Sequence, residues 1–99
     1  MPRKRLDYAA RARRDLEAIE TYHLEVGGET LADRIIDAIL SQAEKIAALG
    51  LIFRPGIRHG TRECVMTSYP YTLVYRIGLR RVEIVRIIHQ RSEYFQRKR

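Results

Sequence analysis

The stretch that decides the fold is SYPYTLVYRI, residues 68–77, followed four residues later by VEIVRIIHQR, residues 82–91. In the first run apolar or aromatic side chains occupy every second position, which predicts a half-buried β-strand over 71–77. The second run is almost continuously apolar and predicts a strand over 81–89 inside a sheet. Because only the short link GLR separates them, we expect the two strands to pair as a hairpin.

The faces of the second strand follow from alternation. Strict alternation would place one set of side chains on each face: Val82, Ile84, Arg86 and Ile88 on the first, and Glu83, Val85, Ile87 and His89 on the second. Which face meets the core stays open at this point. Arg86 is unusual in mid-strand on either face, because a buried charge needs a partner. It has two interpretations, a salt bridge to a carboxylate such as Glu63 or a functional role.

The residues before this hairpin continue the β-structure. TRECVMT, residues 61–67, alternates weakly and predicts a third strand. GLIFRPGIRHG, residues 50–60, holds three glycines and a proline and predicts a loop. Cys64 is the single cysteine, so no disulfide can form within the chain. Inside a strand pattern it is expected to be a small core residue and not a nucleophile.

The first half of the chain has the helical period. Two helices are predicted, over 10–26 and 29–49, with Gly27 and Gly28 between them and Gly50 at the end. A link this short predicts an antiparallel helical hairpin. The repeating positions are Ala12, Leu16, Ile19, Tyr22 and Val26 in the first helix, and Leu31, Ile35, Ile39, Gln42, Ile46 and Leu49 in the second, which Ala32, Ile36, Leu40, Ala43 and Ala47 broaden.

The two ends complete the topology. RKRLDY, residues 3–8, fits a basic edge strand, and the tail QRSEYFQRKR, residues 90–99, predicts a short helix or a frayed end. The order strand, helix, helix, strand, strand, strand predicts a single α+β domain over 1–99. We expect the helix pair to cover one face of a small, mostly antiparallel sheet and to leave the other face partly exposed.

The net charge of the chain limits the classes of binding partner. The formal net charge is +7, and only three of the nineteen basic residues are lysines. The planar guanidinium group suits phosphates and carboxylates, so nucleic acid and an acidic protein are the two partner classes, with an inert basic surface as the alternative. No signal peptide and no membrane-spanning stretch is recognisable, so a cytoplasmic protein is expected.

A candidate site follows from the strand ends. Arginine, histidine and tyrosine together could cleave a phosphodiester by general acid–base chemistry, with arginines holding the charge of the transition state. The candidates are Arg58, His59, Arg62, Arg76, His89, Arg91 and Tyr94. A histidine at a strand end can equally be a capping or packing residue. The three histidines and Cys64 show no metal-ligand spacing, and no cofactor motif is present.

The ordered set of motifs resembles the RelE/ParE superfamily, the toxins of type II toxin–antitoxin systems, also called plasmid stabilisation proteins. The resemblance extends over nearly the whole chain. It rests on two early helices, FRPGIR, a strand opened by TRE, YPYTLVYRI and VEIVRIIHQR. It implies a helix pair on a small antiparallel sheet and a toxin–antitoxin hetero-oligomer. An antitoxin with an acidic segment would account for the +7 charge without nucleic acid.

The resemblance implies one of two activities. ParE-like members inhibit DNA gyrase and are not nucleases, whereas RelE-like members cleave mRNA on the ribosome. The shortage of lysine and the strand ending IIHQR favour the ParE-like activity. In the RelE-like alternative, Arg62, Arg86, His89, Arg91 and Tyr94 would be the catalytic positions. A third interpretation is an inactive member that only binds its antitoxin.

Overall fold

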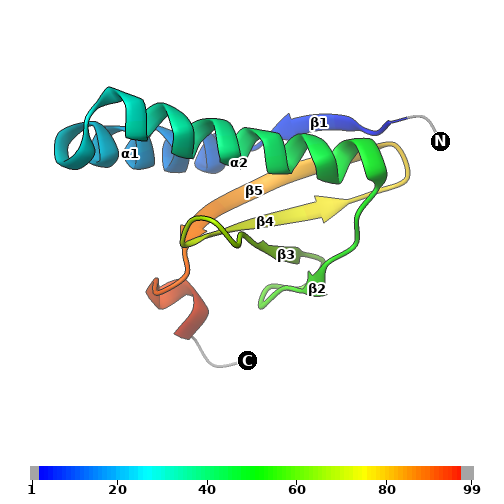
Figure 1. The fold of residues 1–99 in the computed structure, drawn as a ribbon. Helices are drawn as coiled ribbons and strands as arrows, with labels where there is room; N and C mark the ends of the chain where they lie inside the picture. Colours follow the sequence, from blue (N-terminus) through cyan, green and yellow to red (C-terminus); the bar gives the residue numbers. More distant parts are fainter. Residues whose placement is uncertain (1–2, 97–99) are drawn as a thin grey trace.

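The computed structural model describes residues 3–96 of the 99-residue chain, so the last three residues of the predicted tail lie outside the described part. Its elements, drawn in Figure 1, are β1 (Arg5–Tyr8), α1 (Ala10–Gly27), α2 (Glu29–Leu49), β2 (Arg54–Pro55), β3 (Arg62–Val65), β4 (Tyr71–Ile77), β5 (Arg81–His89) and a 3₁₀ helix η1 (Glu93–Gln96). The predicted order of helices and strands is confirmed, with β2 as an additional short strand. Among the described residues no helix is long and apolar enough to cross a membrane.

The helical hairpin turns at a single glycine. Gly28 has φ 86°, a conformation that L side chains rarely adopt, and its backbone N–H donates to Leu24 O at 3.2 Å. At the far end of α2, Gly50 is left-handed with φ 62°, and its N–H returns to Ile46 O. The two glycines therefore set the length of α2.

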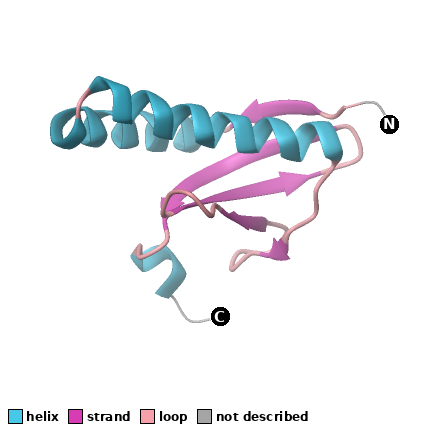
Figure 2. Cartoon of the chain, viewed as in Figure 1, coloured by secondary structure: helices cyan, strands magenta, loops and turns pink. Residues whose placement is uncertain are grey.

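The five strands form one mixed sheet in the order β1-β5-β4-β3-β2. β1 pairs with β5 in parallel, and the other three pairs are antiparallel, as the prediction of a mostly antiparallel sheet required. β2 was not predicted: two residues of the expected loop, Arg54 and Pro55, pair with Glu63 and Arg62. The helical hairpin covers one face of this sheet (Figure 2).

The main core lies between the hairpin and the sheet. Ile39 and Ile46 of α2 and Leu73, Tyr75 and Ile84 of the sheet are all fully buried there. Tyr75 also ties down the chain after α2. Its hydroxyl donates to the carbonyl of Leu51 at 2.7 Å and accepts from the backbone N–H of Phe53 at 3.0 Å.

A β-bulge in β5 changes the predicted faces. The register pairs Tyr75 with Ile84 but Val74 with Arg86, so Val85 is the extra residue. Directly paired residues share a face, and the buried Leu73–Ile87 and Tyr75–Ile84 pairs mark the face under the helices. The prediction from strict alternation is therefore wrong beyond the bulge. Val82, Ile84, Ile87 and His89 lie on the helix side, and Glu83, Arg86 and Ile88 lie on the far side.

The hairpin extends past the sheet at its turn (Figure 1). Tyr22 and Val26 continue the apolar period of α1 but are 57% and 61% exposed. Along α1 only Ala12 and Ile19 are buried. The apolar stripe of α1 therefore continues beyond the sheet that could cover it.

Candidate functional site

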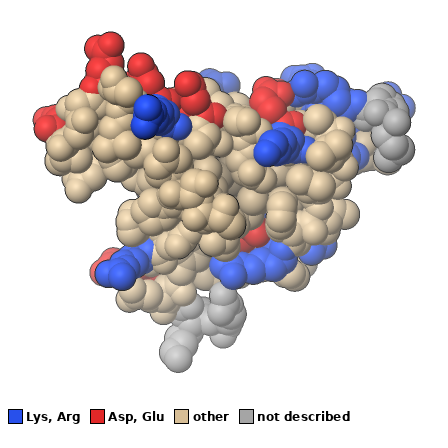
Figure 3. Space-filling view, in the orientation of Figure 1, with Lys and Arg blue, Asp and Glu red and all other residues tan. Residues whose placement is uncertain are grey.

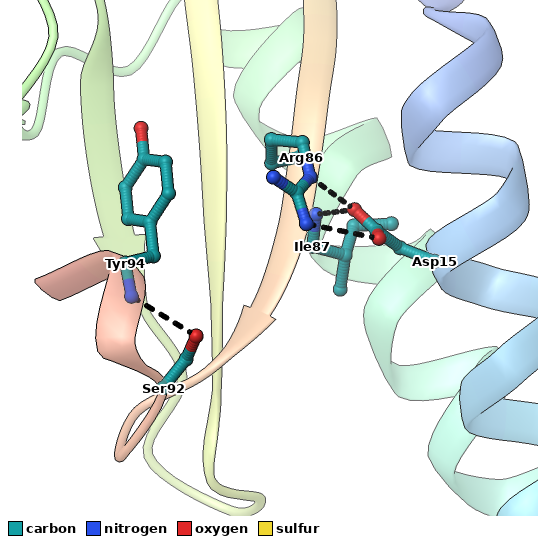
Figure 4. Close-up of polar contacts among 5 residues, drawn as sticks. All are labelled: Asp15, Arg86, Ile87, Ser92 and Tyr94. Carbon is teal, nitrogen blue, oxygen red and sulfur yellow. Dashed lines mark hydrogen bonds and ion pairs between the residues drawn. The ribbon is translucent and has the colours of Figure 1, made fainter.

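The far side of the sheet carries a small cluster around Tyr94. The Tyr94 ring packs with Val74 and Ile88, and the guanidinium carbons of Arg58 and Arg86 lie 5.4 Å and 5.9 Å from its centroid. Its backbone N–H donates to Ser92 Oγ at 3.2 Å at the start of η1 (Figure 4). Among residues 3–96 its enclosed hydroxyl has no hydrogen-bond partner. The ring is therefore part of the far-side packing and also lies beside two arginines.

Arg86 is held by a carboxylate of α1. Its Nε donates to Asp15 Oδ2 at 2.8 Å and its Nη2 to Oδ1 at 3.3 Å, and Asp15 Oδ2 also accepts the backbone N–H of Ile87 at 2.9 Å (Figure 4). The parallel pairing with β1 ends at Ile84, so Asp15 occupies the edge of β5 that β1 leaves open. A salt bridge of Arg86 is confirmed, but the partner suggested by the sequence, Glu63, is wrong.

Glu63 has its own partners instead. Its side chain is 1% exposed, and Oε1 accepts from Arg54 Nε while Oε2 accepts from the backbone N–H of Ile57, both at 3.0 Å. Glu63 and Arg86 both pair with Val74, so they lie on one face with a strand between them. Glu63 therefore fixes the loop after α2 against β3.

The other predicted site residues lie apart from this cluster. Arg62 pairs with Tyr75, which places it on the helix side, and its Nη1 donates to the carbonyl of Phe53 at 3.2 Å. His89 is also on the helix side, and its Nδ1 accepts the backbone N–H of Arg91 at 3.0 Å. Arg91 is exposed in the turn that follows. Of the five predicted positions, the structure brings together Arg86 and Tyr94, and it adds Arg58 from the wider set.

A groove of about 580 Å³ lies between α1 and the end of β5. Its lining is mostly apolar or aromatic and comprises Asp15, Ala18, Ile19, Tyr22, His23, Pro70, Tyr71, Arg86, Ile87, Ile88, His89 and Ser92. His23 Nε2 and the Tyr71 hydroxyl are 2.8 Å apart, and the Tyr71 ring meets His89 edge-on at 5.6 Å. Burial, and next the Tyr22 phenol, raise the pKa of Tyr71, so its hydroxyl stays protonated near neutral pH. The groove fits apolar side chains of a partner better than it fits a charged ligand.

Cys64, the remaining candidate for a chemical role, is a core residue. Cys64 is 2% exposed, as predicted for a core residue, and burial raises the pKa of its thiol, which disfavours the nucleophilic thiolate. Within the described part of the chain no group of three or more His, Cys, Asp or Glu side chains could hold a metal ion.

The sequence did not indicate Asp15, His23 or Tyr71 as site residues. Asp15 is an ordinary polar position of α1 in the helical period, and its partners are more than 70 residues away in the chain. His23 was considered only as a metal ligand. The one available signal was Arg86 itself, since a mid-strand arginine requires a carboxylate somewhere in the fold.

Two solved structures share this arrangement of a helical hairpin over a mixed sheet. A chain of the chromosomal ParDE toxin–antitoxin system from P. aeruginosa superposes with a TM-score of 0.79 and 22% identity, covering 87% of this chain and 95% of that chain. A chain of the toxin–antitoxin complex RelBE2 from Mycobacterium tuberculosis gives a TM-score of 0.65 and 23% identity, covering 93% and 97%. At this level of identity the likeness shows the fold alone.

The sequence comparisons define the family. The model described as "ParE toxin of type II toxin-antitoxin system, parDE" matches residues 6–94. The chain is also 34% identical over 96 residues to the "Putative toxin Y4kP" of Sinorhizobium fredii (strain NBRC 101917 / NGR234), which covers 97% of this chain and 98% of that protein. The chain therefore belongs to the ParE toxin family of type II toxin–antitoxin systems, and the resemblance found in the sequence is confirmed.

Proposed function

We propose that this toxin inhibits DNA gyrase by binding it, without being a nuclease, and that a cognate antitoxin neutralises it. Membership of the ParE family supports the proposal. The main supporting observation is that Arg86 and Tyr94 already have structural roles. The guanidinium of Arg86 is bound to Asp15, and the Tyr94 side chain is enclosed in the far-side cluster. Two of the five side chains that a nuclease would use thus already serve the fold. With gyrase as its target, the toxin would act in the cytoplasm.

An antitoxin partner fits the charge and the groove. The net charge of +7 favours an acidic segment, and the groove between α1 and β5 offers apolar and aromatic side chains beside it. The two similar solved structures come from a toxin–antitoxin system and a toxin–antitoxin complex, which supports a hetero-oligomer of the same kind. We infer that the antitoxin combines charge attraction with burial of apolar side chains in this groove.

The alternative is a ribosome-dependent mRNA endoribonuclease. One observation favours it: Arg58, Arg86 and Tyr94 converge on the far side of the sheet. Such a set could bind a phosphate and supply a proton if an RNA displaced Asp15 and reached the enclosed hydroxyl. The reaction would then depend on the Tyr94 hydroxyl, whereas binding to gyrase would not.

Two assays separate these functions. The purified chain should inhibit supercoiling by gyrase or trap cleaved DNA, and mRNA from cells that express it should show no new cuts. Full supercoiling at excess toxin, with new cuts inside codons, would establish the alternative. Full supercoiling without cuts and without growth arrest would indicate a member that only binds its antitoxin.

The matched variants are Tyr94→Phe and His89→Ala. Tyr94→Phe keeps the ring against Val74 and Ile88 and removes only the hydroxyl, so the fold should be retained. The gyrase proposal expects both variants to keep their toxicity. A loss of about 10²-fold or more in mRNA cleavage by Tyr94→Phe, with unchanged melting, would support general acid–base catalysis instead.

A further inference from the structure

Charge is segregated along the hairpin of this basic protein. Six of its twelve carboxylates fall between positions 15 and 33, where no lysine or arginine occurs. They are Asp15, Glu17, Glu20, Glu25, Glu29 and Asp33. In Figure 3 acidic side chains gather over the hairpin turn, and basic ones gather toward the opposite end, near the N-terminus. The two ends of the hairpin therefore differ in sign.

The turn of the hairpin, which we name the acidic tip, comprises residues 24–33. Leu24, Val26 and Leu31 are 43%, 61% and 37% exposed on it, and every residue from 24 to 31 is exposed. This end extends past the sheet (Figure 1), and the exposed fractions of these side chains leave them open to a partner. An apolar surface set among carboxylates suits an apolar surface set among cations.

The opposite end of α2 provides such a surface, which we name the basic hollow. It has a volume of about 560 Å³, and its lining includes Arg3, Lys4, Ala47, Leu49, Leu79 and Arg80. Leu79 is 87% exposed and Leu49 is 70% exposed. Lys4 Nζ donates to the carbonyls of Gly78 and Leu79 at 2.9 Å and 2.7 Å, which holds the β4–β5 turn beside the end of α2. The backbone N–H of Lys4 also donates to the carbonyl of Ala47 at 2.9 Å, so this residue just before β1 joins the end of α2 to the turn.

We propose that two copies of this chain associate head to tail, with the acidic tip of one seated in the basic hollow of the next. Contacts between two tips or between two hollows would place like charges together, whereas a tip in a hollow pairs opposite charges and buries leucine and valine side chains. The two surfaces lie at opposite ends of α2, whose 21 residues span about 30 Å. One contact therefore leaves a free tip and a free hollow, and the association extends into short chains of molecules.

Salt gives this association a particular signature. At about 0.01 M ionic strength the Debye length is ~30 Å, so two molecules repel each other through their full net charges of +7. At about 0.1 M the range is ~10 Å, and mainly the facing tip and hollow interact. At about 1 M even that attraction is screened to ~3 Å. Association should be strongest at the intermediate salt concentration.

The experiment is sedimentation of the purified chain over a range of concentrations at these three salt levels. The tip variant carries Glu25→Gln and Val26→Ser, and the hollow variant carries Leu79→Ser and Arg80→Gln. All four positions are exposed, and thermal melting of each variant verifies its fold. We expect the mass of the wild-type protein to rise with concentration at about 0.1 M salt, and each variant alone to associate about tenfold more weakly or worse.

A mixture of the two variants identifies the contact. The tip variant keeps an intact hollow and the hollow variant keeps an intact tip, so together they should form a complex of one of each and stop there. A wild-type protein that stays monomeric at about 0.1 M salt would overturn the proposal and leave both surfaces for other partners. Association that persists in either variant alone, or a mixture that stays monomeric while the wild type associates, would also overturn it.

Discussion

The two faces of the sheet are built by different chemistry. The helix-covered face buries Leu73, Tyr75 and Ile84 completely against two helices, in one continuous apolar core. The far face has a small apolar cluster around Val74, and beside it Glu63 and Arg86 are satisfied by hydrogen bonds from within the chain. A partner that binds Glu63 or Arg86 on the far face must therefore replace hydrogen bonds that these side chains already make. The core residues of the other face are covered by the helices and are not accessible to a partner.

The largest effect should come from a charge placed in the helix-covered core. Ile39 is fully buried and Ile35 is 3% exposed, so Ile39→Asp or Ile35→Asp would leave an unpaired carboxylate between helix and sheet. We expect a loss of ~5 kcal/mol or more, which equals the whole free energy of unfolding of a marginally stable domain of this size. Circular dichroism during thermal denaturation measures it.

The control for this core variant is Ile52→Asp, because Ile52 is 67% exposed. It should change the free energy of unfolding by no more than about 0.5 kcal/mol. Normal melting of Ile39→Asp would mean that the two faces do not differ as described.

A smaller effect is expected where the far face meets α1. Asp15→Ala leaves the Ile87 amide without its acceptor and Arg86 without its partner, which should cost about 2 kcal/mol. Asp15→Asn keeps an acceptor and should cost about half as much. Urea denaturation gives both values, and hydrogen exchange at the Ile87 amide should quicken in the alanine variant alone.

Glu17→Ala, on the same helix and exposed, is the matched control for Asp15. It should lie within about 0.5 kcal/mol of the wild-type protein. Equal stability of Asp15→Ala and Glu17→Ala would show that the far-face contacts do not stabilise the fold.

The smallest effect is a pH dependence from the helix-covered side. Burial, and next the carboxylate of Glu44, raise the pKa of Tyr8 to about 12. The folded state thus holds this proton more tightly than the unfolded chain, whose tyrosine pKa is about 10. Stability is unaffected below about pH 10 and falls between about pH 10 and 12. With partial solvent screening the loss is about 1 kcal/mol.

Comparison of Tyr8→Phe with the wild-type protein isolates this contribution in unfolding measurements from about pH 9 to 12. The variant should lose less stability as the pH rises. An identical profile for Tyr8→Phe would place that hydroxyl in water.

Local patterns were sufficient to predict the elements. The predicted helices over 10–26 and 29–49 match α1 and α2 to within one residue, because the apolar period and the glycines act within a few positions. The strand over 71–77 is correct for the same reason. The two-residue β2 was missed because its pairing with β3 depends on Glu63, which orders the preceding loop.

The candidate site was harder to predict because its geometry is not local. Alternation assigned faces correctly only up to the bulge at Val85, which has no distinctive residue type to reveal it. The apolar period of α1 gave no indication that Tyr22 and Val26 would stay more than half exposed. The resemblance to the toxin superfamily indicated the fold, but the contact between Asp15 and Arg86, which are 71 positions apart, could not be predicted from local patterns.

The parallel pairing of β1 with β5 has a consequence for synthesis. Arg5 lies opposite Arg81, so the first strand of the chain cannot find its neighbour until the last strand has been translated. Until then the nascent chain holds helices and a meander with the edge strand unattached. The sheet is thus complete only after β5 has been translated, and a product truncated before β5 cannot assemble it.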